Sequence, residues 1–295
     1  MKFIQKISYI FINLYFILLL FYFLYNKEVF FESFKTTIIL WFEKLVPSIS
    51  TSYILSIFLV NFPLVSYIIY PFFRKVYNFE NRKSCSLFLV SIIVGNPTST
   101  KLINNAVNNN EISITEGNRL LKYSCFISTP FLYSIFEFNI FIFILILELI
   151  TSLIVSKFNY NKIDSIHTKQ SSIYNHSILS TYFDIINSLP TLLLSILSSM
   201  LICNLISLLI PNSYIKSLFE ITSGINILVG LNQSFLTFCI INILIFSHGF
   251  AIILQVYWIL KKSSLSFSNF IKYRLFSVII SLINLIIIYL FIFFF

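Results

Sequence analysis

Two polar interruptions inside long apolar runs are the features of this sequence best suited to binding chemistry. The chain has five glycines in 295 residues, and one falls at each interruption. A helix that breaks inside a membrane leaves peptide N–H and C=O groups that lipid cannot satisfy but a bound solute can. We therefore expect two broken or re-entrant helices at bilayer depth. Their residues are Gly95, Asn96, Pro97 and Thr98 in SIIVGNPTSTK, and His248 and Gly249 in LIFSHGFAIILQ.

The first interruption has local signals that predict unwinding. Gly95 tolerates backbone angles that other residues avoid. Pro97 lacks an N–H and disfavours helix at Asn96. Asn96 or Thr98 can then cap a new helix. The N-terminus of this helix carries a partial positive charge, and we expect it to point into the membrane and attract a carboxylate.

Cations follow the first interruption closely. Lys101 lies on the first turn of the new helix, and Arg119 and Lys122 begin the next apolar segment. We expect these charges to converge on one anion-binding cavity. The alternative is a purely structural kink, with cations that only mark a membrane interface.

Polar residues in the second half could complete such a site. A Ser-His-Gly triplet at membrane depth is costly unless it faces protein or water, and Gln255 lies buried in the apolar run that follows it. Glu220 and Thr222 precede the second interruption in FEITSG. Glu220 is a candidate proton or cation site, or else an interface residue. Glu148, in FILILELITS, is a weaker candidate for a proton relay, the alternative being an acid that only faces the bundle interior.

The composition excludes an ordinary soluble domain. The chain is 58% hydrophobic and 11% charged, so the bilayer must be the solvent for most of it. The expected fold is all-α, a polytopic transmembrane helical bundle forming a single integral membrane domain. Apolar stretches long enough to span a membrane run over residues 7–25, 36–60, 139–155, 182–210 and 270–295. We interpret residues 1–30 as a retained anchor helix.

Charge and motifs narrow the function further. The net charge of +9 is concentrated in connecting segments, which predicts positive-inside topology and contact with anionic lipid. Nucleic acid is not an expected partner. The four cysteines form no C-x-x-C pair and the histidines have no ligand spacing, so we expect no metal and no cofactor. Catalytic motifs are also lacking, so we do not expect an enzyme.

The sequence divides into two comparable halves. We assign residues 36–156 to a first gate-like half, 157–180 to a polar linker loop and 181–295 to a second half. Gly95 and Gly249 have the same separation as Lys101 and Gln255. Pro47 and Pro190 likewise have the same separation as Asn61 and Asn204. These matches predict an internal repeat, although low-complexity apolar sequence also produces them by chance.

Several of these motifs resemble the gate, or nucleoside-recognition, domain of the sporulation integral membrane proteins of the YlbJ type. That family has the patterns W-x-x-x-V-x-P-S, G-x-P-x-G-x-K, R-L-L, P-x-F, E-x-T-x-G and G-G-x-S-x-x-x-Q-V. The likeness runs from about residue 30 to the C-terminus in the right order. Its matching residues are Trp41, Val46, Pro47, Ser48, Gly95, Pro97, Lys101, Ile114, Arg119, Leu120, Leu121, Pro130, Phe131, Glu220, Thr222, Gly224, Gly249, Gln255 and Val256.

This chain is a divergent example of the pattern. Ser99, Asn96, His248, Ala251 and Phe126 replace a glycine, an aromatic, a glycine, a serine and an asparagine of the family. The resemblance implies a transporter-like fold related to nucleoside carriers, in a bacterial cell or forespore membrane. It implies alternating-access transport of a small anionic or nucleoside-like solute, with the dianion dipicolinate as one candidate. The alternative is a non-transporting structural or assembly protein of the spore envelope.

Overall fold

The computed structural model describes residues 13–14, 17–18, 20–62, 64–124, 126–158, 177–231 and 234–294. Within these ranges the chain is helical and contains no strand. Half of the predicted anchor over residues 1–30, and most of the predicted linker over 157–180, lie outside the described residues. Five helices are long and apolar enough to cross a membrane, which confirms an all-α, multi-pass architecture. They are Lys27–Asn61, Phe138–Lys157, Ile178–Ser207, Phe235–Leu260 and Phe267–Leu290.

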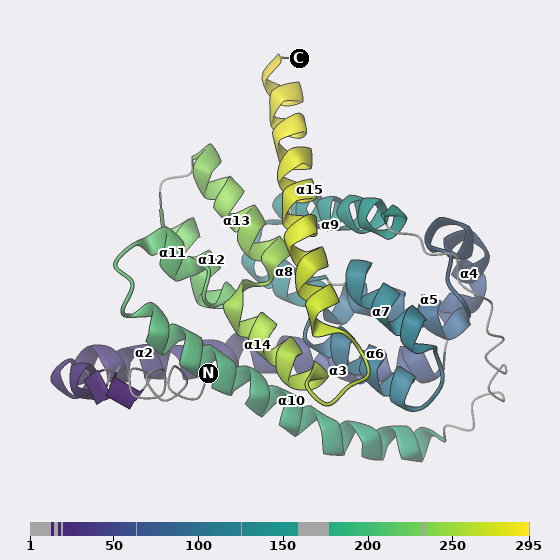
Figure 1. Ribbon diagram of the computed structural model, residues 1–295, viewed down its shortest axis with the longest axis horizontal. Helices are drawn as coiled ribbons and strands as arrows, with labels where there is room; N and C mark the ends of the chain where they lie inside the picture. Colours follow the sequence, from purple (N-terminus) through teal and green to yellow (C-terminus); the bar gives the residue numbers. More distant parts are fainter. Residues whose placement is uncertain are drawn as a thin grey trace, which may run out of the picture.

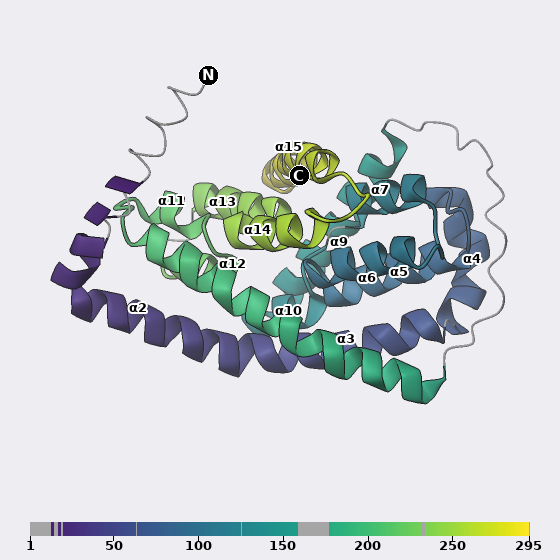
Figure 2. The ribbon, with the colours of Figure 1, turned by 60° about the horizontal axis from the view of Figure 1, so that its bottom comes forward.

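Two long helical rods cross in antiparallel directions, and the other helices pack beside them (Figure 2). The first rod is continuous through α2 (Lys27–Leu40), the π-helical turn η1 (Trp41–Leu45) and α3 (Val46–Asn61). Pro47, which has no N–H to donate, directly follows the π-helical turn, where the regular α-helical hydrogen bonding is already interrupted. The second rod is α10 (Ile178–Ser207). The indole Nε1 of Trp41 donates to the carbonyl oxygen of Leu193 at 3.1 Å, which fixes the rods against each other.

Two reciprocal hydrogen bonds relate the rods by an approximate two-fold. The side-chain amide of Asn61 donates to Thr181 Oγ1 at 3.3 Å, and that of Asn204 donates to Thr37 Oγ1 at 2.9 Å. Each rod thus contributes one asparagine and one threonine to the same kind of contact. Such self-complementary pairing is the mark of an isologous, two-fold related interface. It supports the predicted correspondence of Asn61 with Asn204.

The shorter helices form two similar sets beside the rods (Figure 1). The first set follows α4 (Leu64–Tyr77) and the second follows α10. The helices α6 and α7 pack together as α12 and α13 do, and α7 packs on α9 as α13 packs on α15. The first set is α5 (Arg82–Val94), α6 (Thr98–Asn108), α7 (Ile114–Tyr123), α8 (Thr129–Ile135) and α9 (Phe138–Lys157). The second set is α11 (Ser213–Ser217), α12 (Ile221–Val229), α13 (Phe235–Ser247), α14 (Gly249–Leu260) and α15 (Phe267–Phe294).

The helix packing pairs the elements of the two halves in a different register from the sequence repeat. In the sequence repeat, Gly95 corresponds to Gly249. The packing instead places the interruption at residues 95–97 opposite the one at 218–220, between α11 and α12. It places residues 124–128, between α7 and α8, opposite the interruption at residue 248. Each half therefore has two interruptions, arranged in the same order.

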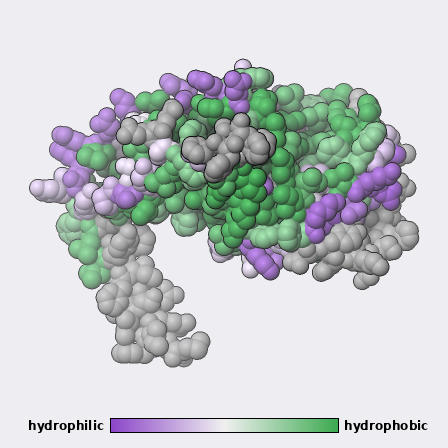
Figure 3. All heavy atoms as spheres, turned by 90° about the horizontal axis from the view of Figure 1, so that it is seen from above, coloured by the Kyte–Doolittle hydropathy of each residue, from purple (hydrophilic) through white to green (hydrophobic). Residues whose placement is uncertain are grey.

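The outer surface suits a lipid environment. Seen from above, hydrophobic side chains cover a broad continuous part of the molecule and hydrophilic ones gather toward its edges (Figure 3). Large apolar side chains are exposed on the candidate spans, including Ile146 on α9, Leu194 on α10 and Ile287 on α15. Apolar patches of this extent are unusual on soluble monomers and typical of surfaces that face lipid.

Replacing Thr37 by valine tests the reciprocal contact. The change keeps the side-chain shape but leaves the amide of Asn204 without its acceptor inside the protein. We expect the free energy of unfolding, measured by denaturant titration in mixed micelles, to fall by about 1–3 kcal/mol. Thr36→Val is the matched control, because the Thr36 hydroxyl is exposed and bonds only within α2. Equal losses in both variants would show that the contact does not hold the rods together.

Candidate functional site

Both predicted helix breaks are confirmed. Gly95 has a φ of +62° between α5 and α6, and the Asn96–Pro97 peptide that follows is cis. His248 and Gly249 have φ values of +69° and +64° between α13 and α14. Left-handed angles of this kind end a helix. Two further breaks, at residues 124–128 and 218–220, were not predicted.

The first break fits closely against the loop between α7 and α8. A Cβ atom on Gly95 would lie 2.2 Å from the Ser128 nitrogen, so no side chain fits there. The N–H of Asn96 donates to the carbonyl oxygen of Phe126 at 2.9 Å. The two interruptions of the first half therefore satisfy one of each other's peptide groups within the protein.

The second half joins its two interruptions in a similar way. The N–H groups of Phe250 and Ala251, at the start of α14, donate to the carbonyl oxygens of Leu218 and Phe219 at 3.0 and 2.9 Å. The expectation that the second break leaves these peptide groups free for a solute is therefore wrong. The chain itself occupies them, because the turn at 218–220 lies directly against the helix start.

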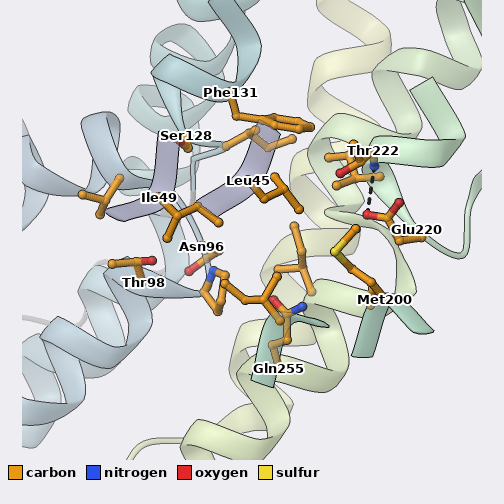
Figure 4. Close-up of a pocket in the computed structure, with 17 residues that line it drawn as sticks. Leu45, Ile49, Asn96, Thr98, Ser128, Phe131, Met200, Glu220, Thr222 and Gln255 are labelled. Atoms are coloured by element: carbon orange, nitrogen blue, oxygen red, sulfur yellow. Dashed lines mark hydrogen bonds between the residues drawn. The ribbon is translucent and has the colours of Figure 1, made fainter. Parts of the chain in front are cut away.

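A cavity of about 50 Å³ lies where the interruptions meet (Figure 4). Its walls come from η1, α3, α5, α6, α8, α10, α12 and α14 and from the loops between them. The structure therefore brings both halves of the sequence to one partly open cavity. Six of the predicted site residues line it: Asn96, Pro97, Thr98, Glu220, Thr222 and Gln255.

Three buried polar atoms in the cavity wall have no hydrogen-bond partner. They are Ser128 Oγ, Thr222 Oγ1 and Gln255 Oε1. The amide nitrogen of Gln255 donates to Ser199 Oγ, so the carbonyl end of this side chain is the unpartnered one. Unsatisfied polar atoms are rare in protein interiors and costly where they occur. Two hydroxyls and one amide carbonyl thus offer donors and acceptors to a ligand in this cavity.

Glu220 gives the cavity its charge. Its carboxylate oxygens accept the N–H groups of Thr222 and Ser223 at 2.9 and 2.7 Å. This is an N-cap, at the helix end that favours a negative charge. Only 2% of the residue is exposed. The carboxylate is therefore fixed by α12, with its negative charge in the wall.

Asn96 links the cavity to His248 behind it. Its carbonyl oxygen accepts from Ser99 Oγ and Thr100 Oγ1, both at 2.8 Å. Its amide nitrogen lies 3.4 Å from His248 Nε2. Neither His248 nor Gly249 lines the cavity. They support its wall from the second half.

The predicted cations do not converge on the cavity. Lys101 Nζ donates to the carbonyl oxygen of Ser188 on α10 at 2.9 Å. Arg119 pairs with Glu116 at 2.8 Å and donates to the carbonyl oxygens of Tyr77 and Asn78. Within the described ranges no Lys or Arg side chain lines the cavity. The expectation of a cationic site is wrong, because each cation instead holds two chain segments together.

Several lining residues were missed from the sequence. Ser128 lies two residues before Pro130, and Phe131 follows it directly. Because Pro130 and Phe131 were matched to the family pattern P-x-F, that motif could have pointed to both lining residues. Met200 on α10 and Leu45 and Ile49 on the first rod carry no such signal. No group of three or more His, Cys, Asp or Glu residues in the described part of the chain has an arrangement suited to a metal.

Comparison with protein-family models, curated proteins and solved structures finds no match to this chain.

A graded set of glycine substitutions tests the close packing at the breaks. Gly95→Ala should be the most damaging, at about 3 kcal/mol or more of unfolding free energy, because it combines a positive φ with a clash at 2.2 Å. Gly249→Ala should cost less, since its φ is also positive but its nearest contact is 3.3 Å away. Gly230→Ala is the control, with a φ of −75° and nearest atoms at 3.5 Å. Denaturant titrations that rank the three variants otherwise would contradict this packing.

Proposed function

We propose that this protein is a carrier-like membrane protein that binds a small polar solute in the cavity between its halves. The proposal rests on one observation, that three residues with an unpartnered buried polar atom line a single cavity where interrupted helices meet. Solute sites near the midplane, between repeated halves with discontinuous helices, are characteristic of secondary transporters. In this proposal the halves rock about the crossed rods to expose the site alternately on the two sides.

The wall chemistry favours a neutral, nucleoside-like solute over a dianion. Ser128 and Thr222 can each donate or accept, Gln255 offers a carbonyl acceptor, and Glu220 adds a fixed negative charge. A dicarboxylate such as dipicolinate would meet a carboxylate without a lining cation to balance it. A solute with hydroxyl or amide donors would satisfy these groups directly.

The size of the cavity requires movement on binding. An engineered cavity of ~150 Å³ binds benzene, and this one measures only about 50 Å³. A ring-containing solute therefore fits only after the interruptions at 95–97 and 218–220 move away from each other. A bacterial, sporulation-linked setting remains part of the proposal, and it rests on the motif resemblance alone.

Thermal unfolding in detergent with added uridine or dipicolinate tests the proposal. A solute that binds the folded protein raises the melting temperature with concentration, by the equivalent of ~2.7 kcal/mol at a hundred times Kd. We expect uridine to stabilise the protein more than dipicolinate. Stabilisation by dipicolinate alone would reverse the preferred solute class. Stabilisation by neither would favour the second candidate, a structural or assembly protein that transports nothing.

Matched variants locate the binding site. Thr222→Val keeps the shape of the wall and removes one hydroxyl, so the affinity for uridine should fall about 5- to 10-fold. Lys101→Met removes a cation that points to α10, so the affinity should not change, whatever its effect on the melting temperature. If Lys101→Met weakens binding and Thr222→Val does not, the solute does not occupy this cavity.

A further inference from the structure

A second cavity, which we call the larger cavity, lies between the halves at the far end of α12. It measures about 450 Å³. Its lining residues belong mainly to α9 of the first half and α13 of the second, and both helices pack on α15 (Figure 1). Ile221 and Thr222, at the start of α12, line the solute cavity, whereas Leu228 and Val229, at its end, line this one. Ligand pockets in proteins measure roughly 300–1,000 Å³, so the larger cavity can hold an organic ligand.

The wall of the larger cavity favours a hydrocarbon. Its lining side chains are mostly apolar, and two of the polar ones are bonded to neighbours. Asn242 Oδ1 accepts from Ser281 Oγ at 2.7 Å, and Thr237 Oγ1 lies 3.1 Å from Ser234 Oγ. In the described part of the chain, no residue of this wall has a buried side-chain polar atom without a partner. Burial of apolar surface is therefore the main source of binding energy here, in contrast to the solute cavity.

The larger cavity opens onto the lipid-facing surface. Ile140 and Phe143 on α9 and Phe238 on α13 line it and are also exposed. Both helices belong to candidate membrane spans. A hydrocarbon chain can thus enter from the bilayer without passing through water. A membrane lipid is therefore the occupant with direct access to this cavity.

Glu137 gives the larger cavity a negative charge. It lines the cavity, is exposed and directly precedes α9. Its side chain does not cap α9, and no Lys or Arg of the described residues forms a salt bridge with it. The described lining residues also include no Lys or Arg. A carboxylate in this position attracts an ammonium group and repels a second anion.

The start of α9 suits the phosphate of a phospholipid. Asn139 lies in its first turn, is exposed and lines the larger cavity. The first N–H groups of a helix have no acceptor within it, and the Glu137 side chain leaves them uncapped here. Helix N-termini of this kind bind phosphate. An ethanolamine phospholipid carries a phosphate next to its chains and an ammonium group beyond it, so each of its charges has a complement at this site.

We propose that the larger cavity binds one acyl chain of an ethanolamine phospholipid, with the head group at the start of α9. The chain fills the space between α9 and α13. The phosphate lies at the helix N-terminus and the ammonium group lies at Glu137. This inference goes beyond the proposed function and does not depend on it, because the two cavities are lined by different residues.

Native mass spectrometry of the protein released from lipid nanodiscs tests the site. The nanodiscs contain equal amounts of dioleoyl phosphatidylethanolamine and dioleoyl phosphatidylglycerol. We expect the protein to retain one phospholipid, with the ethanolamine lipid enriched. Ile140→Trp should lower the retained fraction about tenfold, because the indole displaces roughly two methylene groups of the chain. Ile146→Trp is the matched control, since Ile146 is also an exposed isoleucine of α9 but does not line the cavity.

A second pair of variants tests the head group. Glu137→Gln removes the charge but keeps the shape, so the enrichment of the ethanolamine lipid should fall about 2- to 5-fold, as for an exposed ion pair. Glu32→Gln, at an exposed acid on α2, should leave the enrichment unchanged. Equal enrichment in wild type and Glu137→Gln, or a preference for the glycerol lipid, would overturn the head-group assignment.

The remaining outcomes decide whether a lipid occupies the cavity. Equal lipid retention in Ile140→Trp and Ile146→Trp would overturn the site, as would a lipid-free dimer, which would show that a second copy covers it. If Ile140→Trp does not fold, wild-type protein is cross-linked to phosphatidylethanolamine with a diazirine on its acyl chain. Cross-links must then fall within residues 135–147 and 237–246, and their absence there also overturns the site. A failure of uridine to bind would reject the proposed solute and leave these results valid.

Discussion

The fold depends on one constraint, that every peptide group freed by a broken helix must find a partner inside the protein. Lipid offers none, and an unsatisfied group costs several kcal/mol. The chain meets this constraint by placing its interruptions in pairs. Asn96 donates to Phe126 in the first half, and Phe250 and Ala251 donate to Leu218 and Phe219 in the second. These peptide groups at the breaks are therefore bonded to each other and are not free to bind a solute.

This pairing explains why the cavity is polar through side chains more than through backbone. Among the side-chain atoms of the described lining residues, those left without a partner are Ser128 Oγ, Thr222 Oγ1 and Gln255 Oε1. Side chains can be exchanged without breaking the helix ends, so the same scaffold could accept different solutes by changing them. The glycine at 95 cannot be exchanged in this way, because its lack of a side chain is what allows the two interruptions to approach.

Local signals in the sequence predicted part of this architecture. Gly95 and Pro97 marked the first break, and Gly249 marked the second, because these residues act on the backbone directly. The breaks at 124–128 and 218–220 contain residues such as Phe126, Leu218 and Phe219, which also occur commonly within helices. Their conformation depends on the partner segment, so it follows from tertiary contacts that a single sequence does not display.

The site residues that were predicted correctly also differ from those that were not in how much their placement depends on tertiary contacts. Asn96 and Thr98 were predicted from the first break, Glu220 and Thr222 from the polar segment FEITSG, and Gln255 as a polar residue in the apolar run after the second break. All five line the cavity. Lys101 was predicted from its place on the first helical turn, but its long side chain reaches Ser188, 87 residues away. A flexible cation can extend in many directions, and the rod that receives it is remote in sequence. Position along the helix was therefore informative for short side chains and misleading for long ones.

Under the proposed function, keeping cations out of the cavity wall has a physical benefit. A lysine or arginine in so small a space would need a permanent counter-ion and would oppose the passage of neutral solutes through an apolar bundle. Here the buried Arg274 donates to the Lys122 carbonyl oxygen at 2.7 Å and lies 3.4 Å from His248, and it does not line the cavity. The wall itself is left with hydroxyls, an amide and one capped carboxylate.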